Sequence, residues 1–262
     1  MADDWLGRLN SATKYPPIET YHRLDPATGK LSTPAMFFGK YPVTLTEKVD
    51  GTSGRVVVMP DGDWFIGSRE ELLYARGDRI ENPGLGIVPA LLPLAPALPG
   101  SGSMIRVYFL EVYGYRIGGA AKQYTRDAQA VGYRLLDVAA VPLRVLDLVR
   151  SDIAGWRDRG GQYFFSEEQL TETALAGGIP LVPRLGTVPG NELPAGLADT
   201  ERFLVSWLPE TLVALDDSAG GQPEGIVLRS ADRSLIAKAR FQDYARALQP
   251  EQKSKKEKRE HA

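Results

Sequence analysis

A lysine interrupts an apolar strand pattern just before a glycine turn, and this arrangement limits the folds open to the chain. Residues 41–49 have the composition of an extended segment, and 55–59 form a second run rich in valine. Asp50 and Gly51 lie between them, and an Asp-Gly pair favours a sharp chain reversal. The sequence therefore predicts two adjacent strands joined by a turn, with Lys48 at the end of the first.

Side chains two residues apart project from the same face of a strand. Thr46, Lys48 and Asp50 would therefore share one face. Strand ends beside turns can bring side chains to a ligand while a rigid sheet holds the backbone. We expect these three residues to line a pocket. The residues alone leave open an ordinary hairpin with a solvent-exposed lysine.

Composition excludes several kinds of catalytic site. The chain of 262 residues has no cysteine, which rules out disulfides, thiolate zinc sites and a cysteine nucleophile. His22 and His261 are the two histidines, so histidine triads and multi-histidine metal sites are disfavoured. Catalysis would depend on Lys, Arg, carboxylates or hydroxyls, together with a hard metal ion such as magnesium.

Charge and hydropathy indicate a cytoplasmic protein. The net charge of −2 argues against coating nucleic acid by bulk electrostatics, although a local basic groove remains compatible with it. The run 253–259 is basic, and a disordered tail is favoured there over a nucleic-acid-binding arm. Prolines break the apolar stretch 91–98, and the N-terminus lacks signal-peptide features, so we expect no membrane association.

The order of elements predicts an α+β domain with largely antiparallel sheets and flanking helices. We expect an irregular N-terminal segment over 1–40 packed on a domain spanning 41–250, and a basic tail over 251–262. A three-stranded meander is predicted over 41–69, then a helix over 68–79 and a surface loop over 82–102. Further strands are expected at 106–113, 132–140, 224–230 and 235–240, with a loop over 115–126 between the first two. Helices are expected at 142–158, 166–177, 200–213 and 242–249.

Glu111 is an unusual residue within a strand pattern. Alternation places it on one face with Val107, Phe109 and Tyr113, where an unpaired carboxylate would be costly to bury. We therefore expect a cation, hydroxyl or metal partner. The alternative is an edge-strand glutamate that points to solvent.

Two later segments carry charges in similar settings. Glu224 precedes Gly225 at a strand start, where a ligand or another backbone can approach closely. Lys238 and Arg240 project from one strand face and repel each other unless an anion such as a polyphosphate neutralises them. The alternatives are a turn glutamate and an edge strand protected by charge.

In chain order, these residues resemble the motifs of the covalent nucleotidyltransferase superfamily, and within it the ATP-dependent RNA ligases. The matching segments share the family's lysine, arginine, glutamate and cationic-strand motifs. They are Lys48-Val-Asp-Gly51 (KxDG), Ser68-Arg69, Phe109-Leu-Glu-Val-Tyr-Gly114, Glu224-Gly-Ile-Val-Leu-Arg229 (EGxVxR) and Lys238-Ala-Arg240. The resemblance covers nearly the whole folded chain and implies a nucleotidyltransferase fold.

The resemblance also implies a reaction. Lys48 would attack the α-phosphorus of ATP to form lysyl-AMP, AMP would pass to an RNA 5′-phosphate, and a 3′-hydroxyl would displace AMP, as in RNA repair. Lys48, Lys238 and Arg240 would be catalytic. The nucleotide-binding residues would be Glu47, Lys48, Asp50, Gly51, Arg55, Arg69, Glu111, Glu224 and Lys238. Glu111 and Glu224 would hold Mg²⁺ or Mn²⁺ through water, and a nicked duplex is one possible RNA substrate.

Three departures from the family pattern leave alternatives open. The family's aromatic-Asp-Ile strand maps to residues 136–138, which begin with leucine, so Tyr133 and Tyr113 remain candidates for stacking on adenine. The spacing of Arg55 from Lys48 differs from that in DNA ligases. Too few residues follow Arg240 for an OB-fold, which we do not expect. The alternatives are a minimal DNA ligase, a GTP-dependent capping enzyme and a non-catalytic binding module.

Overall fold

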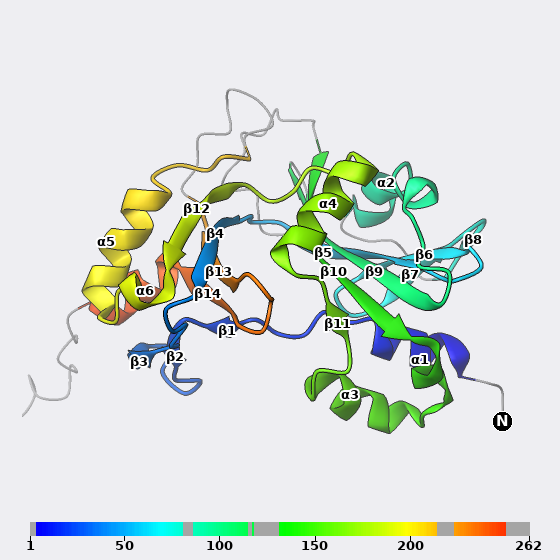
Figure 1. Cartoon of the computed structure of the whole chain (residues 1–262), viewed down its shortest axis with the longest axis horizontal. Coiled ribbons are helices and arrows are strands. Elements are labelled where there is room, and N and C mark those ends of the chain that lie inside the picture. The colour runs from blue at the N-terminus through cyan, green and yellow to red at the C-terminus, as the bar shows by residue number, and fades with distance from the viewer. Residues whose placement is uncertain (1–3, 81–85, 115–116, 118–130, 214–222, 250–262) are drawn as a thin grey trace, which may run out of the picture.

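In the computed structural model, two β-sheets lie side by side and helices cover their outer faces (Figure 1). The structure describes residues 4–80, 86–114, 117, 131–213 and 223–249. The five-stranded sheet has, in spatial order, β1 (Glu19–Thr20), β14 (Ile236–Arg240), β13 (Gly225–Ser230), β4 (Pro42–Lys48) and β12 (Arg184–Pro189). The seven-stranded sheet has β11 (Tyr163–Phe164), β10 (Val131–Pro142), β9 (Met104–Gly114), β5 (Thr52–Val58), β6 (Trp64–Ser68), β7 (Leu72–Ala75) and β8 (Asp78–Arg79).

Helices and a small hairpin complete the described structure. The α-helices are α1 (Trp5–Ala12), α2 (Ile87–Leu91), α3 (Arg150–Asp158), α4 (Glu167–Gly177), α5 (Leu197–Trp207) and α6 (Phe241–Leu248). The 3₁₀ helices are η2 (Ala95–Ala97), η4 (Leu143–Asp147) and η5 (Gly190–Glu192). The hairpin pairs β2 (His22–Leu24) with β3 (Leu31–Ala35). The described strands pair antiparallel in both sheets except for β1 and β14, which confirms the predicted mixture of helices and antiparallel sheets.

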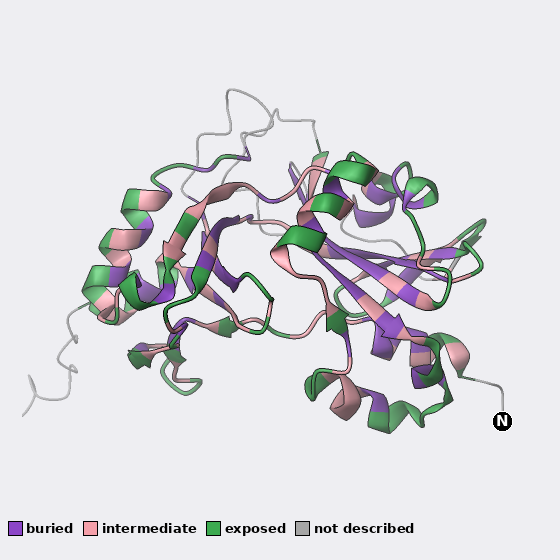
Figure 2. Ribbon diagram, viewed as in Figure 1, coloured by how far each residue is buried: buried purple, intermediate pink, exposed green. Residues whose placement is uncertain are grey.

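Three apolar cores hold the two sheets and their helices together (Figure 2). Alternation along β9 sends Tyr108 and Leu110 into a core beneath α2 and α4, and Val107 and Phe109 into a second core with α1 and α3. Because both faces of this strand are covered, its sequence is almost continuously apolar. A third core lies between the five-stranded sheet and helices α5 and α6. One face of the five-stranded sheet is therefore used for packing, and the other is left for polar residues.

The predicted meander over 41–69 is wrong at its first turn. β4 pairs with β13 and β12, whereas β5 pairs with β9 and β6, so the chain leaves one sheet after Lys48 and enters the other at Thr52. Gly51 is required at this crossing because a Cβ there would lie 2.4 Å from the Val112 carbonyl oxygen. The crossing places the end of β4 directly beside β9.

Two other predictions fail for local reasons. Instead of a helix over 68–79, the Ser68 hydroxyl accepts hydrogen bonds from the backbone N–H groups of Glu70 and Glu71, which closes a turn into β7. Instead of a surface loop over 82–102, the described part forms α2 and η2, whose apolar side chains enter the core. The expected loop over 115–126, apart from Ile117, and the tail over 251–262 lie outside the described residues.

The N-terminal segment is more ordered than the sequence predicts. Leu9 on α1 packs into the core of the seven-stranded sheet, and β1 extends the five-stranded sheet. His22 is fully buried, with its ring nitrogens 2.8 Å from the Tyr244 hydroxyl and 2.9 Å from the Ala195 carbonyl. The described part of this segment, residues 4–40, therefore contributes to both sheets.

The predicted C-terminal and middle helices are largely confirmed. α4 begins after Ser166, whose side chain forms a capping box with Gln169, as the acidic first turn predicts. α3, α5 and α6 lie within or close to their predicted ranges, and η4 replaces the first part of the helix predicted over 142–158. Among the described residues, no helix is long and apolar enough to span a membrane.

Candidate active site

The polar face of the five-stranded sheet gathers the predicted cations. Gly225 on β13 lies between Lys48 on β4 and Arg240 on β14, and the next position along this face places Val227 beside Lys238. Residues paired across neighbouring strands share a face. Lys48, Lys238 and Arg240 therefore all project away from the apolar core beneath this sheet.

Gly225 allows these strands to come close together. A Cβ at this position would lie 2.1 Å from the Ala239 carbonyl oxygen and 2.8 Å from the Arg240 Cα, both of which are backbone atoms that cannot easily move. The sequence prediction of close backbone approach after Glu224 is therefore confirmed, and the neighbour is β14.

Lys48 forms an ion pair with Glu224 in the described structure. The two side chains are 24% and 19% exposed, so the pair is largely covered by protein but still reached by solvent. A pair in this position can exchange partners with a ligand more readily than a fully buried one. It also brings a carboxylate oxygen within hydrogen-bonding reach of the lysine amine.

Glu111 faces this pair from the seven-stranded sheet. Burial raises the pKa of its carboxyl group to about 8, and nearby Lys48 opposes this shift, while the negative charges of Glu224 and Asp50 add to it. Arg69 also lowers the pKa by its positive charge. Electrostatic effects of this kind require short separations, so these five residues form one group across the crossing between sheets.

Lys238 lies where positive charge is in excess. Its pKa is lowered first by burial and then by repulsion from Arg240, Lys48 and Arg69, and Glu224 only partly compensates. Lys238 makes no ion pair with any described residue. An anionic ligand would relieve this repulsion.

Arg240 is not equivalent to Lys238. Its guanidinium donates to both carboxylate oxygens of Asp243, at 2.7 and 3.1 Å, and so is anchored to the start of α6. Asp243 is itself buried. The structure thus brings Arg240 to the site, but its guanidinium already has a carboxylate partner.

Glu47 lies apart from the group around Lys48. It is 1% exposed on the opposite side of β4, where the Thr211 hydroxyl and the Leu212 backbone N–H donate to its carboxylate. Alternation along β4 explains this position, because neighbouring residues face opposite sides of a sheet. Its contacts connect β4 to the segment that follows α5, rather than to the site.

Arg55 also lies outside the group. Its guanidinium is buried and donates to the carbonyl of Arg69 at 3.0 Å and to the side chain of Asn10. Burial lowers the pKa of Arg55 to about 9. These contacts show that Arg55 attaches α1 to the seven-stranded sheet. The Arg69 side chain, in contrast, is 62% exposed to solvent.

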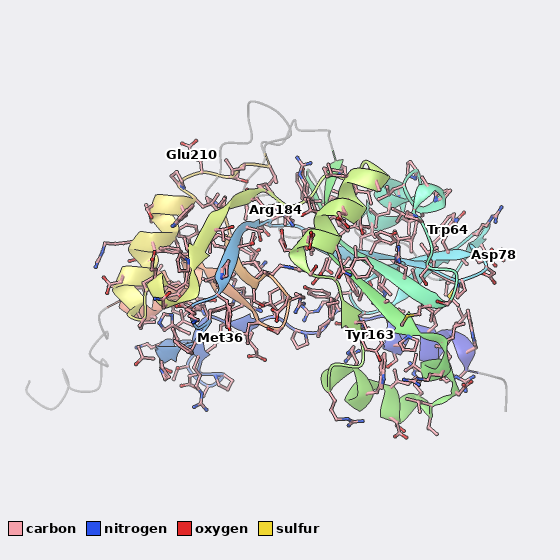
Figure 3. All side chains as sticks on the ribbon, viewed as in Figure 1. Met36, Trp64, Asp78, Tyr163, Arg184 and Glu210 are labelled. Atoms are coloured by element: carbon pink, nitrogen blue, oxygen red, sulfur yellow. The ribbon has the colours of Figure 1, made fainter. Side chains whose placement is uncertain are left out.

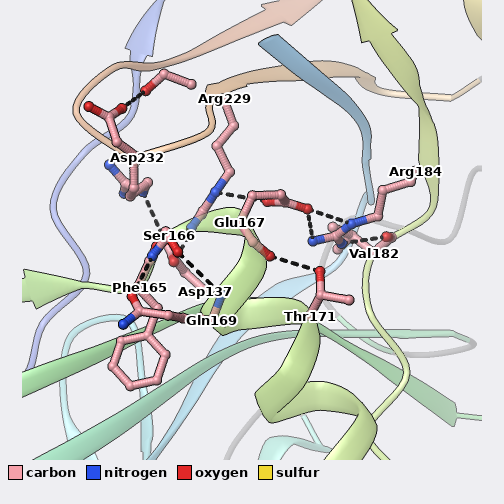
Figure 4. A network of polar contacts seen from close by, with 12 residues as sticks. Asp137, Phe165, Ser166, Glu167, Gln169, Thr171, Val182, Arg184, Arg229 and Asp232 are labelled. Atoms are coloured by element: carbon pink, nitrogen blue, oxygen red, sulfur yellow. Dashed lines mark hydrogen bonds and ion pairs between the residues drawn. The ribbon is translucent and has the colours of Figure 1, made fainter. Parts of the chain in front are cut away.

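Sequence reasoning missed a buried ion network beside the site (Figure 4). Arg229 on β13 pairs with Asp137 on β10 at 2.9 Å and with Glu167 on α4 at 3.1 Å, and Arg184 on β12 donates to Glu167 at 2.9 Å. Figure 3 shows Arg184 between the two sheets. The signal available in the sequence was a carboxylate and an arginine within apolar strands. This network fixes the five-stranded sheet against the seven-stranded one.

Asp137 has two further partners in the same network. Arg233 donates to its second oxygen at 2.7 Å, and the Tyr15 hydroxyl does so at 3.0 Å. Arg233 has a backbone φ of 65°, which is unusual for a residue other than glycine. Its paired side chain accounts for this conformation at the turn between β13 and β14.

Tyr113 and Tyr133, the two candidates for adenine stacking, both pack against other side chains of the protein. Tyr113 is 1% exposed, and the guanidinium carbon of Arg134 lies 6.0 Å from its ring centroid. Tyr133 packs against the core beneath α2 and α4. Val227 instead lies half-buried on the polar face between the strands of Lys48 and Lys238, and sequence reasoning did not single it out.

The described residues contain no group of three or more His, Asp or Glu side chains arranged to hold a metal ion. After burial, the negative charges of Glu224 and Asp50 nevertheless add to the raised pKa of Glu111, and a cation would relieve the repulsion among the three carboxyl groups. These carboxylates fit a magnesium-type ion that takes its remaining ligands from water and phosphate.

Comparisons with known proteins identify the family and the fold. A sequence profile described as RNA ligase matches residues 41–244. An archaeal ATP-dependent RNA ligase superposes with a TM-score of 0.51 at 14% identity, covering 89% of this chain and 49% of that one. A mutant RNA ligase from Naegleria gruberi, solved with ATP and Mn, gives 0.52 at 15% identity, covering 88% of this chain and 63% of that one.

These matches assign the chain to a family by sequence and to a shared fold by structure. No curated protein matches its sequence. The chain spans about half to two thirds of the length of the solved structures named above, and their low identity supports a shared fold. The profile covers most of the chain, from the start of β4 to α6. The chain belongs to the RNA ligase family.

Proposed function

We propose that this chain is an ATP-dependent RNA ligase with a nucleotidyltransferase fold, and that it acts through a lysyl-AMP intermediate on Lys48. The observation that carries the proposal is the position of Lys48, which shares one sheet face with Lys238 and is approached by Glu111 from the other sheet. This arrangement brings together a nucleophile, carboxylates and Lys238, a cation that has no ion-pair partner among the described residues. Family membership and the ATP-bound neighbour support ATP as the nucleotide.

The first step requires a neutral lysine amine. A lysine with the reference pKa of about 10.4 needs about 4 to 5 kcal/mol to lose its proton at neutral pH. Glu224 is within hydrogen-bonding reach to accept this proton, and a bound metal ion would place further positive charge beside the amine. The Lys48 nitrogen then bonds to the α-phosphorus as the bond to the bridging oxygen breaks, and pyrophosphate leaves.

Lys238 would stabilise the negative charge that develops on the α-phosphate during this transfer. A bound Mg²⁺ or Mn²⁺ ion would neutralise the phosphates and assist the departure of pyrophosphate. Glu111 and Glu224, with Asp50 nearby, would hold such an ion through water. Val227 offers an apolar surface for the base, because it lies on the same face between these charged positions.

In the later steps, a 5′-phosphate of RNA attacks the phosphorus of lysyl-AMP, which releases Lys48 and leaves AMP on the RNA end. A 3′-hydroxyl then attacks the activated 5′-phosphate, and AMP departs. Arg69 is exposed beside Glu111 and Lys238 and could contact either phosphate. We propose RNA ends with a 5′-phosphate and a 3′-hydroxyl, including those at a nicked duplex, as the substrates in RNA repair.

A labelling experiment tests the proposal directly. Incubation with α-labelled ATP and magnesium should transfer label to the protein, and Lys48→Ala should abolish it. Lys14→Ala is the matched control, because Lys14 also pairs with a glutamate, Glu70, at 2.8 Å. A Lys48→Ala protein that is labelled as well as the control would contradict the assignment.

The remaining alternatives are separated by the same assay. Labelling by GTP in preference to ATP would favour a capping-type enzyme, and sealing of DNA nicks in preference to RNA nicks would favour a DNA ligase. Mass spectrometry that shows no covalent AMP after ATP and metal would indicate a non-catalytic binding module.

A further inference from the structure

A groove runs along the edge strand β1 next to the candidate active site. Its cavity volume is about 590 Å³. Thr20, Arg23 and Met36 from the N-terminal segment line it together with Lys238, and Met36 is labelled in Figure 3. We call it the Lys238 groove. It is formed largely by β1 and the β2–β3 hairpin, which contain none of the residues assigned to nucleotide transfer.

One end of this groove opens on the polar face that carries Lys48. Thr20 pairs with Lys238 in register, so the two side chains share that face. Lys238 is repelled by Arg240, Lys48 and Arg69, and Glu19 is the acidic residue in the lining. A phosphate group at this end would therefore find more positive than negative charge.

The loop that follows Met36 exposes aromatic side chains. Phe37 is 80% exposed and Tyr41 is 68% exposed, and Lys40 between them is also exposed. Exposed rings interleaved with cations form the surface on which unpaired bases stack in single-strand-binding proteins.

From these features we infer that the Lys238 groove binds the RNA strand that carries the 5′-phosphate end. Its terminal phosphate lies at Lys238, its backbone follows Thr20 and Arg23, and a base stacks on Phe37, which follows Met36 of the lining. This inference rests on the proposed function and assigns the N-terminal segment a role in substrate binding. Phosphates are attracted by the groove's excess of positive charge, and no covalent step is added.

A second cavity of about 660 Å³ on the other side of β1 is a weaker candidate. Arg157 and Arg233 line it, but so do Glu19, Asp158 and Asp232. Arg233 is already bound to Asp137. Because acidic side chains outnumber basic ones in this lining, charge complementarity favours the Lys238 groove for an anionic strand.

Binding of a short 5′-phosphorylated RNA, labelled at its 3′ end and measured by fluorescence anisotropy without ATP, tests the inference. Phe37→Ala should weaken binding by about fivefold or more, as expected for the loss of one stacked base. Arg23→Ala should weaken binding and reduce the salt slope by about 0.7, as expected for one lost phosphate contact. Leu175→Ala (76% exposed) and Arg144→Ala are matched surface controls that should bind RNA like the parent.

The outcomes separate this inference from the proposed function. RNA affinity that is unchanged in both groove variants would overturn the groove assignment, even if the parent forms lysyl-AMP. An equal loss of ATP labelling and RNA binding would also overturn it, because the groove would then serve the nucleotide. If the parent is not labelled by ATP, the proposed function fails, while selective loss of RNA binding in the variants still supports the groove.

Discussion

Two charged groups meet the polar face of the five-stranded sheet, and they differ in how their charges are paired and buried. In the buried network, Asp137 is 0% exposed and Arg229 is 4% exposed, and each charge has a partner of opposite sign. In the group around Lys48, the residues are partly exposed and Lys238 has no acidic partner among the described residues. Buried charges that are paired with each other are typical of structural roles, whereas a partly exposed cation without an ion-pair partner is typical of a ligand-binding site.

The difference also explains how the site is assembled. Lys48 and Glu224 belong to one sheet and Glu111 belongs to the other, so their separation depends on how the sheets are held together. Asp137 and Arg229 connect the same two sheets. The buried network therefore helps to position the group around Lys48.

The largest expected effect on stability comes from removing a carboxylate from the buried network. Asp137→Ala would leave Arg229 and Arg233 buried without their shared carboxylate and should lower the free energy of unfolding by about 3 to 5 kcal/mol. Chemical denaturation measures this change. Asp137→Asn is the companion variant, since it keeps the shape and should show whether the charge matters. A loss under about 1 kcal/mol in Asp137→Ala would show that the network is not needed for stability.

The opposite behaviour is expected at Lys238. Lys238→Met removes a cation that its neighbours repel, so stability should be unchanged or higher at neutral pH, because the pKa of Lys238 is lowered in the folded protein. Label transfer from ATP should fall by about 10²- to 10³-fold, as for the loss of one transition-state contact. Lys14→Met serves as the control. A Lys238→Met protein that is less stable than the parent but is labelled equally well would show that Lys238 has a structural role and is not needed for nucleotide transfer.

The sequence predicted the strand positions of the candidate site residues better than the connections between their strands. The strand positions of Lys48, Glu111 and Lys238 follow from local alternation, and alternation also explains why Glu47 faces the other way. Residue pattern alone did not reveal that the chain changes sheets at Gly51, because Asp-Gly pairs are also typical of hairpins.

The parts that could not be predicted depend on contacts between distant segments. β4 pairs with β13 from the far end of the sequence, and Asp137 finds Arg229 only when both sheets are assembled. An arginine within a strand pattern predicts a buried partner but does not identify it. The exposure of Phe37 is likewise a property of the folded surface that a loop sequence does not show.

Glu111 should make stability depend on pH. Its carboxyl group has a pKa of about 8 in the folded protein, against about 4.3 for an ordinary glutamate. Between these values the folded state binds more protons than the unfolded state, so the free energy of unfolding should decrease as pH rises from about 5 to about 8. Glu111→Gln should remove this part of the decrease. Denaturation curves for the two proteins that stay parallel across this range would show that the carboxyl group is already ionised.

The smallest effect is expected where an ion pair lies in solvent. Arg202 and Asp199 form a pair on α5 with side chains 71% and 62% exposed. Water solvates both charges whether or not they meet, so Arg202→Ala should change the free energy of unfolding by less than about 0.5 kcal/mol and leave label transfer as in the parent. If this variant cost as much stability as Asp137→Ala, the contrast would have to be explained by something other than burial. A small effect would confirm that burial, rather than the presence of a pair, separates the structural charges of this molecule from those on its surface.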